Sequence, residues 1–267
     1  MLKNSSRIGL FCVLALLLCL PSLQAAPLKS LEQAAAFFQG VQGTFVLYDE
    51  AADQYTVYNQ PQSEKRLPPC SSFKIYNSLI ALETGVAVDE AMVIAWNGQP
   101  SSITAWNRDH TMTSAIQNSV VWYYQVLAQR IEPQRMQQHL DVLPYGNRDI
   151  SGGIDRFWLH SSLVINAREQ VDLLRRLYQD DLPFSSRNMA IVRKIILQSE
   201  TDGVRFSGKT GSAYVGGQFT VGWFVGAVER DQRRYFFAVN IEGEKEASGM
   251  KAHGIAVDVM KSLAILP

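Results

Sequence analysis

The chain has 267 residues, of which 47% are hydrophobic and 19% charged, and its 25 basic and 25 acidic side chains cancel to a formal net charge of zero. A chain of this length and apolar content can bury a large core, as one large domain or two interleaved ones. The balanced charge excludes the strongly basic footprint of proteins that bind nucleic acids or anionic membranes.

The first 25 residues have the layout of a cleaved secretory signal. Lys3 and Arg7 precede an apolar run over residues 8–20, and Ala25 supplies the small residue that suits signal peptidase. The run is short for a membrane span, so an uncleaved anchor is only the alternative. We expect residues 1–25 to be a signal peptide and residues 26–267 to form a periplasmic or secreted mature chain with no membrane contact after cleavage.

Cysteine usage predicts a fold without an internal disulfide. Cys12 and Cys19 leave with the signal, so Cys70 has no partner within the mature chain, although the exported compartment permits disulfides. The fold must therefore be stabilised by its core. We interpret Cys70 as a small buried residue and not as a catalytic thiol.

The first predicted elements are a helix over residues 31–39 and a β-hairpin. The helical periodicity stops at Gly40, and residues 44–49 and 54–59 read as two strands joined by a short turn. Residues 71–83 then form a mostly apolar helix that ends before Gly85.

The middle of the chain is largely helical and its end is rich in strands. Helices are predicted at residues 121–130, 133–142, 167–179 and 187–197, with Asn166 and Ser186 at N-cap positions. Strands are predicted at residues 204–207, 219–229 and 235–241, followed by a helix at residues 250–263.

This order of elements predicts an α/β (α+β) fold. N- and C-terminal strands would form one antiparallel sheet flanked by terminal helices, with a mainly helical subdomain inserted at about residues 71–197 of a single catalytic domain. Ser71 then lies at the seam between the two parts, where clefts commonly form.

Ser71 and Lys74 place a hydroxyl and an amine three residues apart, on one face of the predicted helix. A serine hydroxyl is a weak nucleophile until a base takes its proton, and a lysine serves as that base only where its positive charge is suppressed. The pattern alone is weak, because chance supplies about one Ser-x-x-Lys in a chain of this length. A second one is present at Ser248 and Lys251.

A second group of polar residues is Lys209-Thr210-Gly211, followed by Ser212. It suits an anionic carboxylate, but it also reads as a polar strand end with a glycine kink. Residues 203–210 match the Walker A pattern, yet that loop needs an apolar strand before it and a helix after it. Residues 198–202 are polar and no helix pattern follows, so we set nucleotide hydrolysis aside.

Three further segments have ordinary local interpretations. Ser119 reads as a helix N-cap, Tyr145-Gly146-Asn147 as a turn, and Trp158 as part of an apolar anchor in a loop. The four histidines have no ligand-like spacing, and no Gly-x-Ser-x-Gly motif is present. A metal site and a Ser-His-Asp triad are therefore improbable.

Taken together and in this order, these segments resemble the serine β-lactamase and penicillin-binding protein superfamily, in which Ser-x-x-Lys, a second serine motif and Lys-Thr-Gly converge on one cleft. Val121 after the second serine, Tyr145-Gly146-Asn147, and Trp158 narrow the resemblance to the class D, oxacillinase-type β-lactamases. The resemblance spans the whole mature chain.

The resemblance implies hydrolysis of β-lactams through a serine acyl-enzyme. It assigns Ser71 as nucleophile and Lys74 as a base that carbon dioxide carboxylates, with no other cofactor and no metal. Ser119 and Lys209 would complete the catalytic group. The implied substrate-binding residues are Val121, Tyr145, Asn147, Trp158, Thr210, Gly211 and Ser212. The implied partner is a small β-lactam and no nucleic acid, and a homodimer is left open.

One departure and two rivals accompany this resemblance. Many family members place an arginine before the last helix to pair with the substrate carboxylate, whereas this chain has Lys251, which lacks the bidentate fork of arginine. A β-lactam sensor acylates without rapid turnover, and it tends to carry a polar residue in place of Val121. A cell-wall transpeptidase is disfavoured by Val121 and Trp158.

Overall fold

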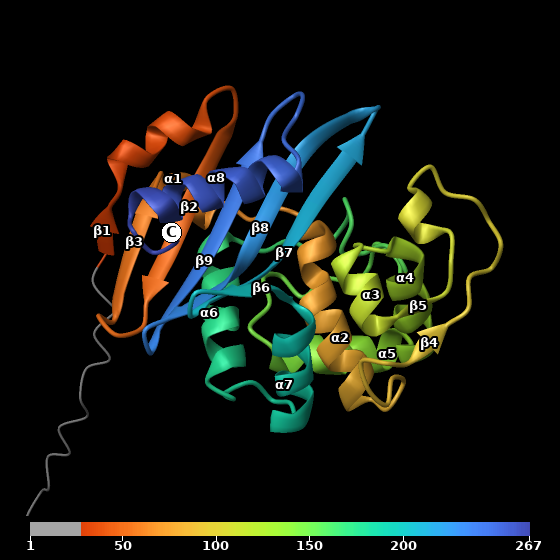
Figure 1. The fold of residues 1–267 in the computed structure, drawn as a ribbon. Helices are drawn as coiled ribbons and strands as arrows, with labels where there is room; N and C mark the ends of the chain where they lie inside the picture. Colours follow the sequence, from red (N-terminus) through yellow and green to blue (C-terminus); the bar gives the residue numbers. More distant parts are fainter. Residues whose placement is uncertain (1–27) are drawn as a thin grey trace, which may run out of the picture.

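The computed structural model describes residues 28–267, so the expected signal segment at residues 1–25 lies outside the described residues. Within these residues the main sheet has the strand order β1-β3-β2-β9-β8-β7-β6 (Figure 1). Its strands are β1 Leu28–Ser30, β2 Gln42–Asp49, β3 Gln54–Tyr58, β6 Leu197–Thr201, β7 Val204–Val215, β8 Gln218–Arg230 and β9 Arg233–Glu242. Neighbours are antiparallel except β1, which is parallel to β3. The expected sheet built from both ends of the chain is confirmed.

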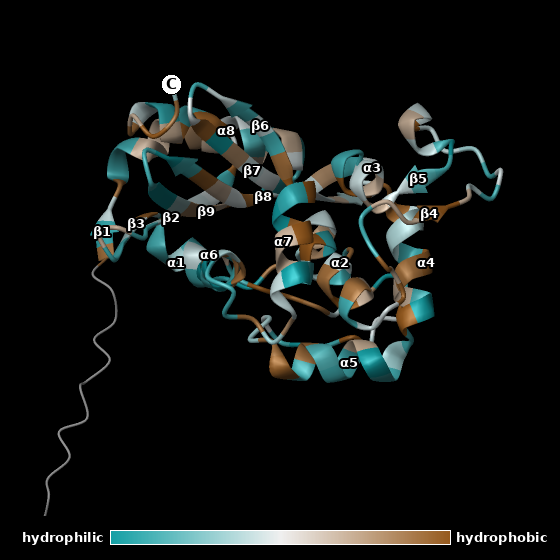
Figure 2. Ribbon diagram, turned by 60° about the horizontal axis from the view of Figure 1, so that its bottom comes forward, coloured by the Kyte–Doolittle hydropathy of each residue, from teal (hydrophilic) through white to brown (hydrophobic). Residues whose placement is uncertain are grey.

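Helices cover both faces of this sheet. Helix α8 (Gly249–Ser262) and the 3-10 helix η1 (Glu32–Phe38) lie on one face, and α6 (Ala167–Tyr178) lies on the other (Figure 1). Side chains alternate along β2, so that Phe45 enters the core under α8 and Val46 enters the core shared with the helical part. The sheet is thus buried on both faces, and Figure 2 shows hydrophobic residues along β8 and β9.

The remaining elements connect β3 to β6. They are α1 Gln60–Glu64, η2 Cys70–Phe73, α2 Lys74–Glu83, β4 Val93–Ile94, η3 Thr104–Trp106, β5 His110–Thr111, α3 Met112–Gln117, α4 Val121–Ile131, α5 Pro133–Val142 and α7 Ser186–Ile195. Helix α2 is buried along nearly all its length and packs against α3, α4 and α7. Among residues 28–267 no helix is both long and apolar enough to cross a membrane.

Local differences from the expected elements have simple causes. The side chain of Ser185, and not Ser186, accepts a hydrogen bond from the Asn188 N–H and caps α7. Strand β6 was not expected, because its exposed polar residues carry no alternating hydrophobic pattern. Strand β7 extends past Ser207 to Val215, so Lys209 lies within a strand and the Walker A interpretation is excluded.

Candidate active site

Ser71 lies in a tight 3-10 turn at the start of α2. The turn is entered through Cys70, whose φ of 51° is in the left-handed region, and it continues directly into the α-helix at Lys74. The two residues therefore share one helix face, and Lys74 Nζ lies 2.5 Å from Ser71 Oγ. The local spacing thus brings nucleophile and base into direct contact.

Ser119 reaches the same place from the short connection between α3 and α4. Its φ of 53° bends the chain there, and Val120, not Ser119, occupies the N-cap position of α4 without a side-chain cap bond. Ser119 Oγ lies 3.5 Å from Lys74 Nζ. The cap interpretation of Ser119 is therefore wrong, because its hydroxyl is turned toward the lysine.

Lys209 joins this group from β7. Its Nζ donates hydrogen bonds to Ser119 Oγ at 3.0 Å and to the Thr210 carbonyl at 2.9 Å. The structure thus brings together Ser71, Lys74, Ser119 and Lys209, which lie far apart in the sequence. Ser119 links the two amines.

Burial gives both lysines unusual proton affinities. The side chain of Lys74 is completely buried, which lowers its pKa well below the ordinary 10.5, and the charge of Lys209 lowers it further. Burial also lowers the pKa of Lys209, to about 7. Burial thus favours the neutral amine of Lys74, whose free electron pair can accept the Ser71 proton.

Strand β7 packs edge-on against the nucleophile turn through Gly211. A Cβ at this position would lie 2.7 Å from the Pro69 carbonyl oxygen and 3.2 Å from the Ser71 nitrogen. Such a contact with backbone requires a shift of one segment. Glycine is needed here because it lets the strand and the turn approach each other closely.

Beyond Gly208, the edge of β7 has no neighbouring strand in the described part of the chain and faces the catalytic residues. Gly208 N–H bonds the Ile196 carbonyl at 2.9 Å, so backbone N–H groups two and four residues later, at Thr210 and Ser212, point the same way. Strand β6 has ended there, since its pairing with β7 runs no further than Ser207. Ser212 Oγ accepts a hydrogen bond from the Gly249 N–H at 2.8 Å, which ties α8 to this edge.

The aromatic ring of Tyr124 lies over the amine of Lys74. Its Nζ lies 5.5 Å from the ring centroid of Tyr124, whose hydroxyl is 2.8 Å from Ser78 Oγ. Tyr124 was missed as a site residue, although it lies three residues after Val121, on the same face of α4. Val121 itself is half-buried in the first turn of α4. The full burial of Lys74 keeps water from its amine and so favours the neutral form.

Trp158 is a buried donor without an acceptor. Its ring is fully buried and stacks on Phe73, the neighbour of Lys74, with 6.0 Å between ring centroids. Its Nε1–H has no hydrogen-bond partner among residues 28–267. A buried N–H of this kind costs free energy unless a further group accepts its hydrogen bond.

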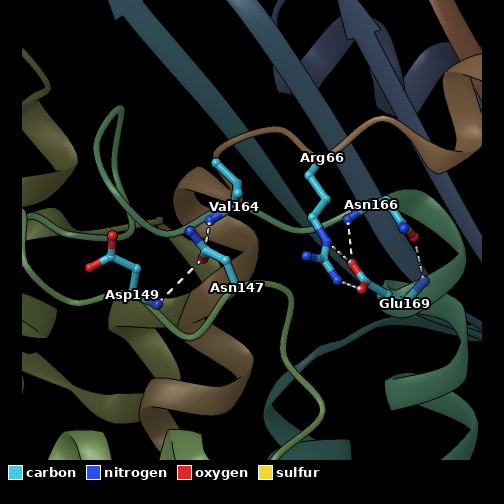
Figure 3. A network of polar contacts seen from close by, with 6 residues as sticks. All are labelled: Arg66, Asn147, Asp149, Val164, Asn166 and Glu169. Atoms are coloured by element: carbon cyan, nitrogen blue, oxygen red, sulfur yellow. Dashed lines mark hydrogen bonds and ion pairs between the residues drawn. The ribbon is translucent and has the colours of Figure 1, made fainter.

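Tyr145 and Asn147, which were expected to contact substrate, both make contacts within the protein in the structure. Tyr145 is fully buried and its ring packs edge-on against Phe73 and Tyr76, so it lies beneath the site. Asn147 binds its own loop: it accepts a hydrogen bond from the Val164 N–H (Figure 3). It also donates one to the Ser162 carbonyl. Both residues hold the segment that carries Trp158.

The neighbouring contacts in Figure 3 fix the other end of that segment. The Asn166 side chain accepts from the Glu169 N–H, and the Glu169 carboxylate accepts from the Asn166 N–H, which forms a capping box at the start of α6. Arg66 forms an ion pair with the same carboxylate. The loop from Asn147 to Asn166 is therefore anchored at both ends.

The burial of Tyr145 makes a testable prediction. Tyr145→Phe keeps the buried ring that packs against Phe73 and Tyr76 and removes only the hydroxyl, so we expect KM to change by less than about twofold and the unfolding temperature to change little. Steady-state kinetics and thermal unfolding measure both. A several-fold rise in KM with unchanged stability would instead indicate that the Tyr145 hydroxyl contacts the substrate.

Two other chemistries find no support at the site. The thiol of Cys70 is fully buried and its pKa is raised to about 12, so it remains protonated at neutral pH. In the part of the chain that the structure describes, no three His, Cys, Asp or Glu side chains are grouped as metal ligands.

Comparisons with known proteins agree with this arrangement. Residues 43–261 match the penicillin binding protein transpeptidase domain. The chain is 42% identical over 229 residues to the probable β-lactamase YbxI of Bacillus subtilis (strain 168), covering 86% of this chain and 84% of that protein. The solved structure of the class D β-lactamase BAT-2 is similar, with a TM-score of 0.84, 39% identity, and coverage of 88% of this chain and 96% of the other. The C-terminal domain of the Bacillus licheniformis BlaR penicillin receptor is similar too, with a TM-score of 0.87, 34% identity, and coverage of 92% and 100%.

Proposed function

Because the chain belongs to the class D serine β-lactamases of the penicillin-binding protein transpeptidase family, we propose that it hydrolyses β-lactam antibiotics through an acyl-enzyme on Ser71. The observation that carries this proposal is the 2.5 Å contact between Ser71 Oγ and the buried Lys74 amine. A neutral amine at this distance can take the hydroxyl proton as Ser71 attacks the lactam carbonyl carbon. This attack forms a tetrahedral intermediate. When that intermediate collapses, the C–N bond of the lactam ring breaks and the acyl group stays on Ser71.

The proton for the departing lactam nitrogen is assigned to Ser119. Its hydroxyl lies between the two amines, 3.5 Å from Lys74 and 3.0 Å from Lys209. It can give a proton to the nitrogen and be reprotonated from a neighbouring amine. When Lys209 is protonated, its positive charge favours proton transfer from the Ser119 hydroxyl to the lactam nitrogen.

Backbone donors are assigned to the lactam carbonyl oxygen. The N–H groups of Ser71 and Ser212 would form an oxyanion hole, in which donors fixed in advance stabilise the developing negative charge. The close approach of β7 to the Ser71 turn at Gly211 supports this pairing, because it sets the two N–H groups across a narrow gap.

The substrate carboxylate is assigned to the hydroxyls of Thr210 and Ser212. Lys251 lies in the first turn of α8, whose Gly249 N–H bonds Ser212, and its ammonium is 4.0 Å from the Glu246 carboxylate. We assign Lys251 a secondary part in carboxylate binding, since it offers a single charge without the fork of an arginine and shares it with Glu246.

The surroundings of Lys74 fit carboxylation by carbon dioxide. Only a neutral amine adds carbon dioxide, and burial lowers the pKa of Lys74 and so favours its neutral form. The N–H of Trp158, buried beside Phe73 and without a partner among residues 28–267, suits an added carboxylate as acceptor. That carboxylate would supply a base for the water that releases the product.

The proposal is tested by counting turnovers. The purified mature chain is mixed with a chromogenic penicillin or cephalosporin, and product is counted per mole of protein. Many equivalents support a β-lactamase. A single equivalent with a stable adduct on Ser71 would replace it with the sensor function, which the likeness to the BlaR receptor domain makes the second candidate.

The neutral state of Lys74 makes turnover depend on bicarbonate and pH. Because the pKa of Lys74 is lowered, the amine becomes protonated only as pH falls through this lowered value, so activity should be lost as pH falls through it and held above it. We expect bicarbonate depletion at neutral pH to lower penicillin turnover at least about tenfold, within the range that a general base contributes, and added bicarbonate to restore it. Turnover that ignores bicarbonate would contradict the carboxylated base.

We also propose that the protein is exported to the periplasm or secreted. The basic and apolar pattern of residues 1–25 supports this assignment. N-terminal sequencing of the mature protein tests it, with cleavage near Ala25 as the expected result.

A further inference from the structure

A cavity of about 280 Å³ lies beside the open edge of β7. Its walls come from three segments, residues 116–117 at the end of α3, residues 195–198 where α7 passes into β6, and residues 208–210 of β7. Lys209 and Thr210 thus belong both to this cavity and to the active site, whereas Ser71, Lys74 and Ser119 do not line it. The cavity adjoins the catalytic group without coinciding with it.

A β-bulge shapes the mouth of this cavity. Leu197 pairs with Ser207 and Ser199 pairs with Phe206, so Gln198 is an extra residue in β6. A bulge turns the side chain of the extra residue out of the regular alternation. The amide of Gln198 accordingly bonds the Gly208 carbonyl of β7 at 3.1 Å and lies exposed at the cavity.

The lining determines what kind of group fits. Four aliphatic residues line it, Ile116, Ile195, Ile196 and Leu197, but more of the exposed wall is polar than apolar, because Gln117, Gln198, Lys209 and Thr210 line it too. Lys209 is the single lining residue with a titratable side chain, and it is already bonded to Ser119. The volume lies just under the range of about 300–1,000 Å³ that whole drug-sized ligands occupy. The space therefore suits one uncharged substituent and not a complete substrate.

We propose that this cavity is a subsite for an uncharged, ring-sized substituent carried next to the carboxylate of the β-lactam, with Gln198 as a specificity-determining residue at its mouth. The inference rests on the proposed β-lactam hydrolysis. Thr210 connects the carboxylate site with the cavity, since its hydroxyl is assigned to the substrate carboxylate and it also lines the cavity. In a cephalosporin the ring carbon beside the carboxylate-bearing carbon carries the variable C3 substituent, so that substituent enters the cavity.

The test compares two cephalosporins with the same acyl side chain. One carries a methyl group at C3, and the other carries a neutral aryl group joined through carbon, so that it stays attached. We expect kcat/KM to be about tenfold higher for the aryl compound, at the lower end of what an extra apolar contact contributes to discrimination. The rate of Ser71 acylation, followed by mass spectrometry, should show the same preference.

Substitution at Gln198 then locates the preference. Gln198→Phe fills the mouth and should abolish the roughly tenfold preference for the aryl compound while changing the methyl compound less than about twofold. Ser199→Phe is the matched control, because Ser199 is exposed on the same strand and does not line the cavity. Gln198→Glu gives an independent readout: it should favour a cationic C3 substituent several-fold over the neutral aryl group.

Each outcome decides between the proposals. Acylation that shows no preference in the unmodified protein overturns the subsite, and so does an equal loss for both compounds in Gln198→Phe, since that would indicate a structural role. If neither cephalosporin nor any penicillin acylates Ser71, the proposed function itself fails and the subsite falls with it. If Gln198→Phe selectively loses activity toward the aryl compound, the result supports both the proposed hydrolysis and the subsite.

Discussion

Replacement of Lys74 by methionine should lower kcat/KM for β-lactams about 10⁴-fold, the scale on which loss of a base or its orienting partner acts in serine hydrolases. Methionine has a similar length and volume but no basic nitrogen, so Ser71 loses the group that lies 2.5 Å from its hydroxyl. The same change should leave the unfolding temperature unchanged or raise it, because an amine that is costly to bury is replaced by an apolar chain.

Opposite effects on activity and stability separate this result from misfolding. Lys261→Met, at an exposed position near the end of α8, is the control and should alter neither quantity. Steady-state kinetics and thermal unfolding are measured on both variants. A Lys74→Met protein that retains more than a hundredth of the activity would exclude Lys74 as the base.

Trp158→Phe should slow release of the acyl-enzyme about 10²- to 10³-fold, the contribution expected of a positioned general base. Phenylalanine keeps the stacking on Phe73 but removes the buried N–H, so a carboxylate on Lys74 loses the donor proposed to hold it. Acylation of Ser71 should be affected less, because the neutral amine itself can still take the proton. The acyl-enzyme should therefore accumulate.

Two measurements establish the cause of that accumulation. Mass spectrometry follows the adduct on Ser71, and carbon-13 NMR with labelled bicarbonate follows the carboxylated lysine independently of turnover. Trp96→Phe is the control, since the Trp96 indole bonds the Gln99 carbonyl in a surface loop. A Trp158→Phe protein with an undiminished carbamate signal would show that the indole holds something else.

Much of the fold was predictable because its segments have strong local patterns. Helices α4, α5 and α6 begin at the expected residues, and the capping box of Asn166 and Glu169 explains why the start of α6 is sharp. Strand β6 was not predictable, since its exposed polar residues resemble a loop. It is a strand because β7 offers a partner, and this pairing is a tertiary contact.

In the candidate site, too, local sequence patterns predicted some features and tertiary contacts determined others. Tyr145 and Asn147 belong to a motif that was expected to touch substrate, yet their surroundings bury the first and bind the second to its own loop. Tyr124 was missed because a tyrosine three residues along a helix is also what an ordinary core contains. Only its position 5.5 Å from Lys74 distinguishes it.

The sequence by itself determined that Ser71 and Lys74 share one turn, because a spacing of three residues places them on one helix face in any surroundings. It also determined the order of most strands and helices through their hydrophobic periods, with β6 as an exception. Only the tertiary structure decided that Ser119 and Lys209 meet this pair, that burial lowers the pKa of Lys74, and that a bulge turns Gln198 to the cavity. The reason is physical: burial and charge proximity depend on segments far apart in the chain, and no local pattern records them.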